Sequence, residues 1–185
     1  MKPFKQAVAC AKTQEAKVAK FLSEHFECYV HPELNSNPYF DGTIFLDLAP
    51  TDRGGNTWDE AVLNDHAFNM STATYELKDE RAYSSKTGNH FVEIESRKKS
   101  TGICHTKADY WIVQPDNFKL LMIPSKDLVK GIVQNKWREV RGGDVEDGVQ
   151  TSIGILVPLQ WIEDNGKVLT RGQNIPLFDD KVPKV

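Results

Sequence analysis

Apolar residues recur at helical spacing near the start of the chain. Within residues 13–26 they fall near i, i+3, i+4 and i+8, which predicts an amphipathic helix. These apolar residues are Val18, Phe21, Leu22 and Phe26. Thr13 is the expected N-cap of this helix, and Glu15 would then lie in its first turn, where an acid is favoured by the helix dipole.

The rest of the pattern predicts strands, loops and one more helix. Runs of β-branched and aromatic residues predict strands at 27–31, 39–48, 73–78, 90–96, 109–114 and 118–123. Residues 125–137 fit a helix with Ser125 as its cap. Prolines and glycines indicate an inserted loop at about residues 49–64 and an irregular tail from about residue 170. The order of elements predicts a mixed α/β (α+β) fold.

Composition indicates a soluble globular protein. The chain has 185 residues, of which 39% are hydrophobic and 26% are charged, and we expect a single domain spanning residues 1–185. Every apolar run is shorter than the roughly 20 residues that a membrane span needs. Lysines interrupt the apolar segments near the N-terminus, so no signal peptide is visible. We therefore expect a cytoplasmic protein.

Cysteine, histidine and overall charge exclude some kinds of site. The three cysteines are widely spaced without a Cys-x-x-Cys motif, and no pair of the five histidines has the spacing of zinc ligands. Reduced thiols are therefore expected in place of a disulfide framework or a zinc site. The net charge of −3 argues against a protein that coats nucleic acid nonspecifically, although a local basic face remains compatible with it. Residues 97–99 (Arg-Lys-Lys) are a candidate for such a face, or a solvated turn.

A carboxylate and an ammonium group stand two residues apart in the expected strand 73–78. Because side chains alternate along a strand, Glu76 and Lys78 should project from the same face. Such a pair suits phosphodiester hydrolysis, since the carboxylate can hold a divalent metal and the ammonium can neutralise charge on the phosphate. About one Glu-x-Lys is expected by chance in a chain of this composition. Spacing alone therefore favours a solvated ion pair.

A longer string of residues gives this motif a context. From Tyr75 to Trp111 the chain reads YELKDERAYSSKTGNHFVEIESRKKSTGICHTKADYW. This string resembles small phage-type members of the PD-(D/E)XK nuclease superfamily, including Holliday-junction-resolvase-like endonucleases. The resemblance covers about residues 13–125. It implies a restriction-endonuclease-like mixed β-sheet flanked by helices. It also implies metal-dependent hydrolysis of DNA phosphodiesters, in phage recombination or DNA processing.

The resemblance assigns roles to four positions of the helix and the Glu-x-Lys strand. Glu76 would bind the metal, Lys78 would be the catalytic ammonium, and the backbone carbonyl of Leu77 would complete the coordination shell. Glu15 matches the acid that family members often carry on the first helix. The implied cofactor is Mg²⁺ or Mn²⁺, which prefer hard oxygen ligands. The implied partner is duplex or branched DNA, and a homodimer is left open.

Several flanking residues match the family string. For each of them, a structural role is the main alternative to a role in the active site. Residues 87–89 (Thr-Gly-Asn) should shape the turn into the next strand, with Thr87 either there or near substrate. Glu93 and Glu95 should share one face of strand 90–96, in a structural or a metal-binding role. Lys107 and Asp109 match the string, and Asp109 would cap or brace a strand end. The aromatic pair at residues 110–111 is expected to pack in the core, which we favour over stacking on bases.

The family's first acid has three candidates in this chain. Asp41 opens the strand expected at 39–48, and the loop at 49–64 would then be inserted between two hairpin strands. Asp65 has the more usual spacing but lies in a polar run that makes a poor strand. Asp47 would share a face with Asp41. We favour Asp41.

Two function classes stay open on the sequence. The first is a metal-dependent DNA endonuclease, whose preference for duplex, branched or single-stranded substrate, and for DNA over RNA, is undetermined. The second is a non-catalytic protein that binds nucleic acid or another partner with the same fold, since fold does not fix function. The presence of Asp41, Glu76 and Lys78 together favours the enzyme.

Overall fold

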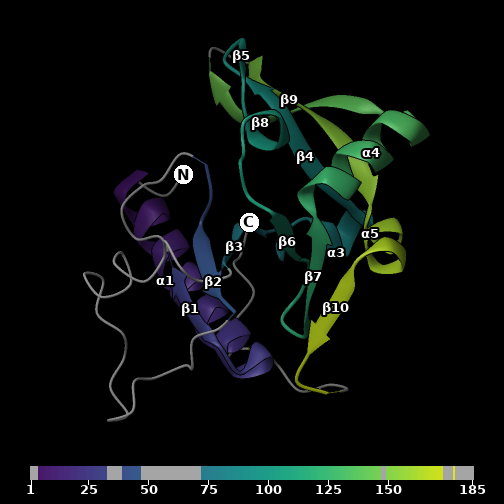
Figure 1. The fold of residues 1–185 in the computed structure, drawn as a ribbon. Helices are drawn as coiled ribbons and strands as arrows, with labels where there is room; N and C mark the ends of the chain where they lie inside the picture. The colour runs from purple at the N-terminus through teal and green to yellow at the C-terminus, as the bar shows by residue number, and fades with distance from the viewer. Residues whose placement is uncertain (1–3, 33–38, 47–71, 147–148, 173–176, 178–185) are drawn as a thin grey trace. The chain divides into compact units, whose positions relative to one another are not determined.

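The chain divides into two compact units whose boundary lies inside one strand. The computed structural model describes residues 4–32, 39–46, 72–146, 149–172 and 177 (Figure 1). The first unit is Met1–Glu76 and the second is Leu77–Val185, so strand β3 (Thr72–Asp79) contributes residues to both. The loop expected at 49–64 and most of the expected irregular tail lie outside the described residues.

The first unit is a helix and a small antiparallel sheet. Helix α1 (Phe4–Phe26) contacts β1 (Tyr29–Pro32) and β2 (Gly42–Phe45). Strand β2 pairs antiparallel with β1 on one side and with Thr72–Tyr75 of β3 on the other. The side chains that α1 buries include three of the predicted apolar positions. These are Val18, Phe21 and Leu22.

The first helix begins earlier than the hydrophobic pattern predicts. Thr13 lies inside α1 and is not its N-cap, because the preceding residues of the helix include three alanines and no helix breaker, so nothing stops the helix at that point. Glu15 therefore sits well inside the helix and outside the first turn. The helix ends at Phe26 because Glu27 adopts a positive φ of 54°, a common way to terminate a helix.

The second unit holds the remaining strands and helices. Its elements after β3 are α3 (Ser84–Thr87), β4 (Asn89–Ser96), β5 (Lys99–Ser100), the 3₁₀ helix η2 (Gly102–Cys104), β6 (Tyr110–Gln114), β7 (Lys119–Pro124), α4 (Ser125–Asn135), β8 (Glu139–Glu146), β9 (Val149–Pro158), α5 (Leu159–Asn165) and β10 (Lys167–Thr170). Strands β8, β9 and β10 and helix α5 were not predicted. The strand order is β1-β2-β3-β6-β7-β10 in one sheet and β5-β4-β9-β8 in the other. The mixed α+β class is confirmed.

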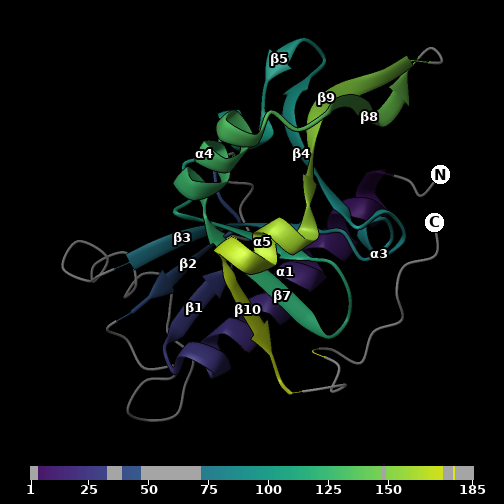
Figure 2. The ribbon, with the colours of Figure 1, turned by 90° about the vertical axis from the view of Figure 1, so that its right-hand side faces the viewer.

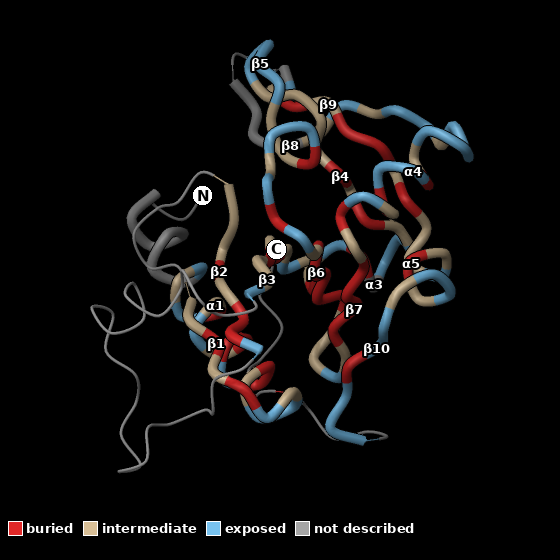
Figure 3. Tube along the Cα trace, in the orientation of Figure 1, coloured by how far each residue is buried: buried red, intermediate tan, exposed pale blue. Residues whose placement is uncertain are grey.

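The core of the second unit is built by β4, β6, β7 and β9 with the helices α4 and α5. Figures 2 and 3 show α5 beside β7 and β10, and the buried segments along β6 and β7. The fully buried side chains include Trp111, Leu121, Ile123, Leu128 and Ile162. Both faces of β6 and β7 are buried, which explains their nearly continuous apolar runs.

The predicted helix at 125–137 is confirmed as α4, but its predicted cap is wrong. Ser125 is the first helical residue after Pro124, and its Oγ is buried without a hydrogen-bond partner. Its backbone N–H donates to the main-chain oxygen of Asp109 at 2.8 Å. Pro124, with its fixed φ and no N–H of its own, precedes the helix, and the loop before β6 supplies the acceptor.

Candidate active site

Strand β3 presents Glu76 and Lys78 together. Tyr75 and Leu77 are buried, and the residues that alternate with them, Glu76 and Lys78, are half-buried. Since alternate residues of a strand share a face, the carboxylate and the ammonium project side by side, away from the buried tyrosine and leucine. The shared face predicted from the two-residue spacing is therefore present.

The main chain of Asp41 lies beside Glu76. Its backbone N–H donates to the carbonyl oxygen of Tyr75 at 2.7 Å, and that carbonyl belongs to the peptide that joins Tyr75 to Glu76. The next residue, Gly42, is the first residue of β2 and the register partner of Tyr75. The pairing of β2 with β3 thus places the main chain of Asp41 next to that of Glu76, although the two residues are far apart in the sequence. Asp47 and Asp65 lie outside the described residues.

Two of the proposed acids act electrostatically on Tyr75. Tyr75 is fully buried, and its pKa is raised first by burial and then by the negative charges of Asp41 and Glu15. Because charge repulsion weakens with distance, both acids belong to the electrostatic surroundings of Tyr75 in the first unit. Glu15 lies inside α1, away from either end of the helix.

The hydroxyl of Tyr75 is an unused polar group. Among the described residues it has no hydrogen-bond partner, although it is buried. The Tyr75 ring lies over Gly42 so closely that a Cβ at that position would collide with it. A buried hydroxyl without a partner is costly, so this hydroxyl lowers the stability of the first unit.

The acids fit a hydrated cation better than a cage made wholly of protein. Over the described part of the chain, no three His, Cys, Asp or Glu side chains are arranged to enclose a metal. Mg²⁺ usually binds through one or two carboxylates and keeps several of its waters. Two acids on neighbouring strand segments, Asp41 and Glu76, match that preference.

Lys78 rests against a buried tryptophan in the second unit. Its Nζ lies 5.1 Å from the centroid of the Trp111 ring, within range of a cation–π interaction. The indole Nε1–H of Trp111 donates to Nε2 of His90 at 2.9 Å. The opposite ring nitrogen of His90, Nδ1, is 3.1 Å from Oε1 of Glu80. The ammonium is therefore positioned on a ring that a histidine and a glutamate hold in place.

These hydrogen bonds fix the state of the histidine. An indole N–H only donates, so Nε2 of His90 must accept and carries no proton. The proton then sits on Nδ1, which donates to Glu80. His90 and Trp111 are fully buried, so neither can exchange its partner for water. No local sequence pattern indicates Glu80 and His90, because the contact between His90 and Trp111 spans 21 residues.

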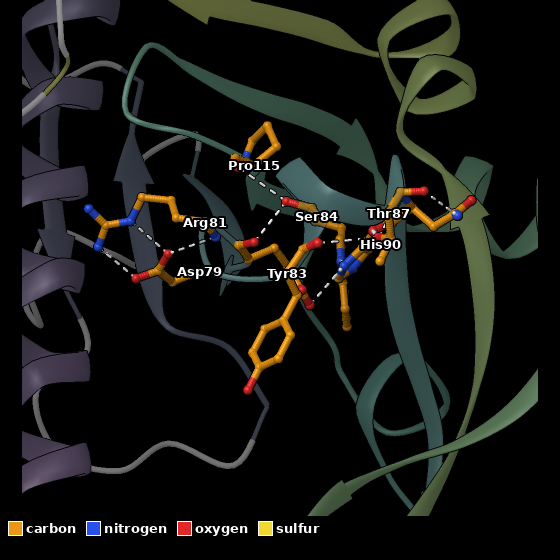
Figure 4. Close-up of polar contacts among 10 residues, drawn as sticks. Asp79, Arg81, Tyr83, Ser84, Thr87, His90 and Pro115 are labelled. Carbon is orange, nitrogen blue, oxygen red and sulfur yellow. Dashed lines mark hydrogen bonds and ion pairs between the residues drawn. The ribbon is translucent and has the colours of Figure 1, made fainter. Parts of the chain in front are cut away.

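The segment that follows β3 is clamped by polar side chains (Figure 4). Arg81 is buried and makes two hydrogen bonds to the carboxylate of Asp79, at 2.7 and 2.8 Å, and a third to Asn117 at 3.0 Å. Ser84 Oγ donates to the main-chain oxygen of Pro115 at 3.1 Å. A two-pronged arginine–carboxylate contact is both strong and directional. It fixes the end of the strand that carries Lys78.

The residues between α3 and β4 form the predicted turn. Gly88 has a φ of 67°, a left-handed conformation that side chains disfavour. Asn89 Nδ2 donates to the main-chain oxygen of Thr87 at 2.8 Å, and the backbone N–H of Asn89 donates to Thr87 Oγ1 at 3.2 Å. The turn-shaping role expected of Thr87, Gly88 and Asn89 is therefore confirmed.

The expected shared face of Glu93 and Glu95 is wrong. A β-bulge between them makes Glu93 pair with Gly154 and Glu95 pair with Ile153. Consecutive residues of β9 point to opposite sides, and directly paired residues share a side, so the two glutamates face opposite ways. Trp111 belongs to the core, as expected. The main-chain oxygen of Asp109 accepts the backbone N–H of Ser125 next to the start of β6, while the role of the Asp109 side chain stays a prediction.

Comparison with known proteins adds no assignment. No protein-family model, curated protein or solved structure matches the chain. No helix in the described ranges is long and apolar enough to cross a membrane.

Proposed function

We propose that this chain is a divalent-metal-dependent endonuclease that hydrolyses phosphodiester bonds in DNA. One observation carries the proposal: the backbone of Asp41 is bonded to the peptide that precedes Glu76. Two acids on adjacent strands, with Lys78 next on the same face, are the arrangement that the resemblance to PD-(D/E)XK nucleases implies. Duplex and branched DNA are both candidate substrates.

The proposed cofactor is Mg²⁺ or Mn²⁺. Asp41 and Glu76 would hold it through carboxylate oxygens, with the carbonyl of Leu77 as a third ligand. A bound ion of this kind polarises the phosphoryl group and makes a bound water more acidic. Glu15, whose charge reaches Tyr75 alongside that of Asp41, would accept hydrogen bonds from waters at this site.

The chain's own residues supply positioning and charge. Lys78 would place its ammonium against the negative charge that develops on the phosphate during attack, an interaction worth most in the transition state. Trp111 limits where that ammonium can go, because the cation is attracted to the ring face. Tyr75, which faces away from Glu76 and Lys78, would support the site through its buried ring, which packs over Gly42 of the neighbouring strand.

The first test uses Glu76→Gln, with Glu27→Gln as a matched control. Glu27 is an exposed glutamate in the same unit, so the control removes the same charge elsewhere. Supercoiled plasmid and a synthetic four-way junction serve as substrates in Mg²⁺, Mn²⁺, Ca²⁺ or excess chelator. We expect Mg²⁺ and Mn²⁺ to support cleavage, Ca²⁺ to support little, and Glu76→Gln to lose cleavage by about 100-fold or more.

The second test separates catalysis from binding with Lys78→Ala, using Lys130→Ala of α4 as the control. Lys78→Ala should lower cleavage by about 100-fold or more while DNA binding in Ca²⁺ stays nearly unchanged. Cleavage that persists in excess chelator, or full activity in Lys78→Ala, would overturn the proposal. A protein that binds DNA tightly and never cuts either substrate would instead be the non-catalytic alternative.

A further inference from the structure

The turn between β4 and β5 carries three consecutive cations at the tip of a hairpin. Ser96 pairs with Lys99, which leaves Arg97 and Lys98 as a two-residue loop. Arg97, Lys98 and Lys99 are all exposed. Figures 1 and 2 show this hairpin at one end of the second unit, next to the ends of β8 and β9.

The backbone of this loop is unfavourable for the residues that occupy it. Arg97 has a φ of 48° and Lys98 a φ of 62°, so both lie in the left-handed region. Two-residue hairpin loops with two positive φ values strongly prefer Asn-Gly, Asp-Gly or Gly-Gly, because other side chains clash with the backbone. Long basic side chains at both positions oppose the local preference, which points to a use for their charge.

The hairpin is nevertheless held firmly. The backbone N–H of Arg97 donates to the main-chain oxygen of Thr151 on β9 at 2.9 Å. On the β4 side, Glu95 pairs with both Ser100 and Ile153, so β4 is hydrogen-bonded on its two edges at the base of the loop. The cations are thus displayed from a fixed strand end, so a partner that binds them does not have to order the backbone of the hairpin.

We propose that this basic tip, Arg97-Lys98-Lys99, contacts the phosphate backbone of the DNA substrate. The inference rests on the proposed function, because it takes DNA as the partner. The whole chain has a net charge of −3, so attraction to DNA must come from a local group of cations. Contacts of this kind position DNA without reading its sequence, and they weaken with salt because bound counterions are released.

The test replaces the loop with the sequence that its backbone prefers. Arg97→Asn combined with Lys98→Gly removes two charges and relieves the strain of both positive φ values. The control, Lys126→Gln with Lys130→Gln, removes two exposed charges from α4 in the same unit. Lys99→Gln removes the third cation separately, at a position in β5 outside the two-residue turn. Binding of a fluorescein-labelled duplex is measured in Ca²⁺, where turnover is suppressed, over a range of salt concentrations.

The loop variant should melt about 2–4 °C higher than the wild type, as relief of backbone strain predicts for a chain of this size. Its log–log slope of affinity against salt should become shallower by about 1.8, and its affinity near 0.1 M salt should fall roughly 10-fold or more. Lys99→Gln should change the slope by about 0.9. The α4 control should keep the wild-type slope.

An unchanged slope in both the loop variant and Lys99→Gln would overturn the inference, as would an equal loss in the α4 control. A wild-type protein that does not bind the duplex at all would overturn it too. Binding in Ca²⁺ that depends on the basic tip, together with no cleavage in Mg²⁺, would leave this inference standing while the proposed endonuclease activity fails.

Discussion

Replacing Trp111 with phenylalanine tests the support that the structure gives to Lys78. The substitution keeps an aromatic ring in the core and removes the indole N–H that donates to His90 Nε2 at 2.9 Å. It also shrinks the surface on which the Lys78 ammonium rests at 5.1 Å. One change therefore perturbs stability through the histidine and catalysis through the lysine.

The expected loss of stability can be built from two contributions. His90 is fully buried, so its Nε2 would lose the donor that Trp111 supplies in a place that water does not reach, at a cost of about 1–3 kcal/mol. The smaller ring removes roughly 40 Å³ of core volume, which adds about 1 kcal/mol at about 24 cal/mol per Å³. The free energy of unfolding should fall by about 2–4 kcal/mol.

The effect on catalysis should be smaller and of a particular kind. A cation–π contact at a partly desolvated site contributes about 0.5–2 kcal/mol, so a weaker ring should lower kcat roughly 2- to 10-fold. KM for DNA and the affinity for Ca²⁺ should stay close to the wild-type values, because Trp111 would act through Lys78 and touch neither ligand.

Urea unfolding followed by circular dichroism measures the first quantity, and single-turnover cleavage measures the second. Trp137→Phe is the matched control, because Trp137 is half-buried and lies at the margin of the same core. Its ring packs edge-on against that of Trp161, with the two ring centroids 5.0 Å apart. Its loss should stay near 1 kcal/mol with no change in kcat. If Trp111→Phe costs no more than Trp137→Phe, the histidine is not held as described. If kcat is unchanged, the ring does not position Lys78.

Three further predictions follow from the first unit. Asp41→Asn should abolish cleavage and weaken Ca²⁺ binding while leaving the unfolding curve nearly unchanged, and an active variant would remove Asp41 from the site. Above about pH 10 the Tyr75 hydroxyl loses its proton in the unfolded chain but keeps it in the folded chain, where its pKa is raised. The free energy of unfolding should therefore fall above this pH by up to about 1.4 kcal/mol per pH unit. Tyr75→Phe should remove this contribution to the fall in unfolding free energy, measured by urea titrations at alkaline pH. A variant whose unfolding free energy falls with pH as steeply as that of the wild type would contradict this. Gly42→Ala should cost about 1–3 kcal/mol by forcing a Cβ into the Tyr75 ring, whereas wild-type stability would show that the ring can move away.

Local sequence was sufficient wherever a short pattern controls the outcome. The alternation around Glu76 and Lys78 depends only on a strand's two-residue period, and the structure keeps it. The Thr87-Gly88-Asn89 turn likewise depends on a residue that tolerates a positive φ and on side chains that bond to their own backbone. The helix before β1 was predicted in type, but its start was not, because its first residues favour a helix without showing the apolar period.

Tertiary structure decided what the site contains. Asp41 reaches Glu76 only because β2 pairs with β3, a contact between segments far apart in the chain whose register no local pattern specifies. Glu80, His90 and Trp111 form one chain of hydrogen bonds because β4 and β6 are brought together in the core of the second unit. The bulge that turns Glu93 and Glu95 to opposite sides arises from pairing with β9, a strand that the sequence analysis did not predict. A sequence states which side chains are present and how each segment alternates, but partners across a sheet are chosen by the packing of the whole unit.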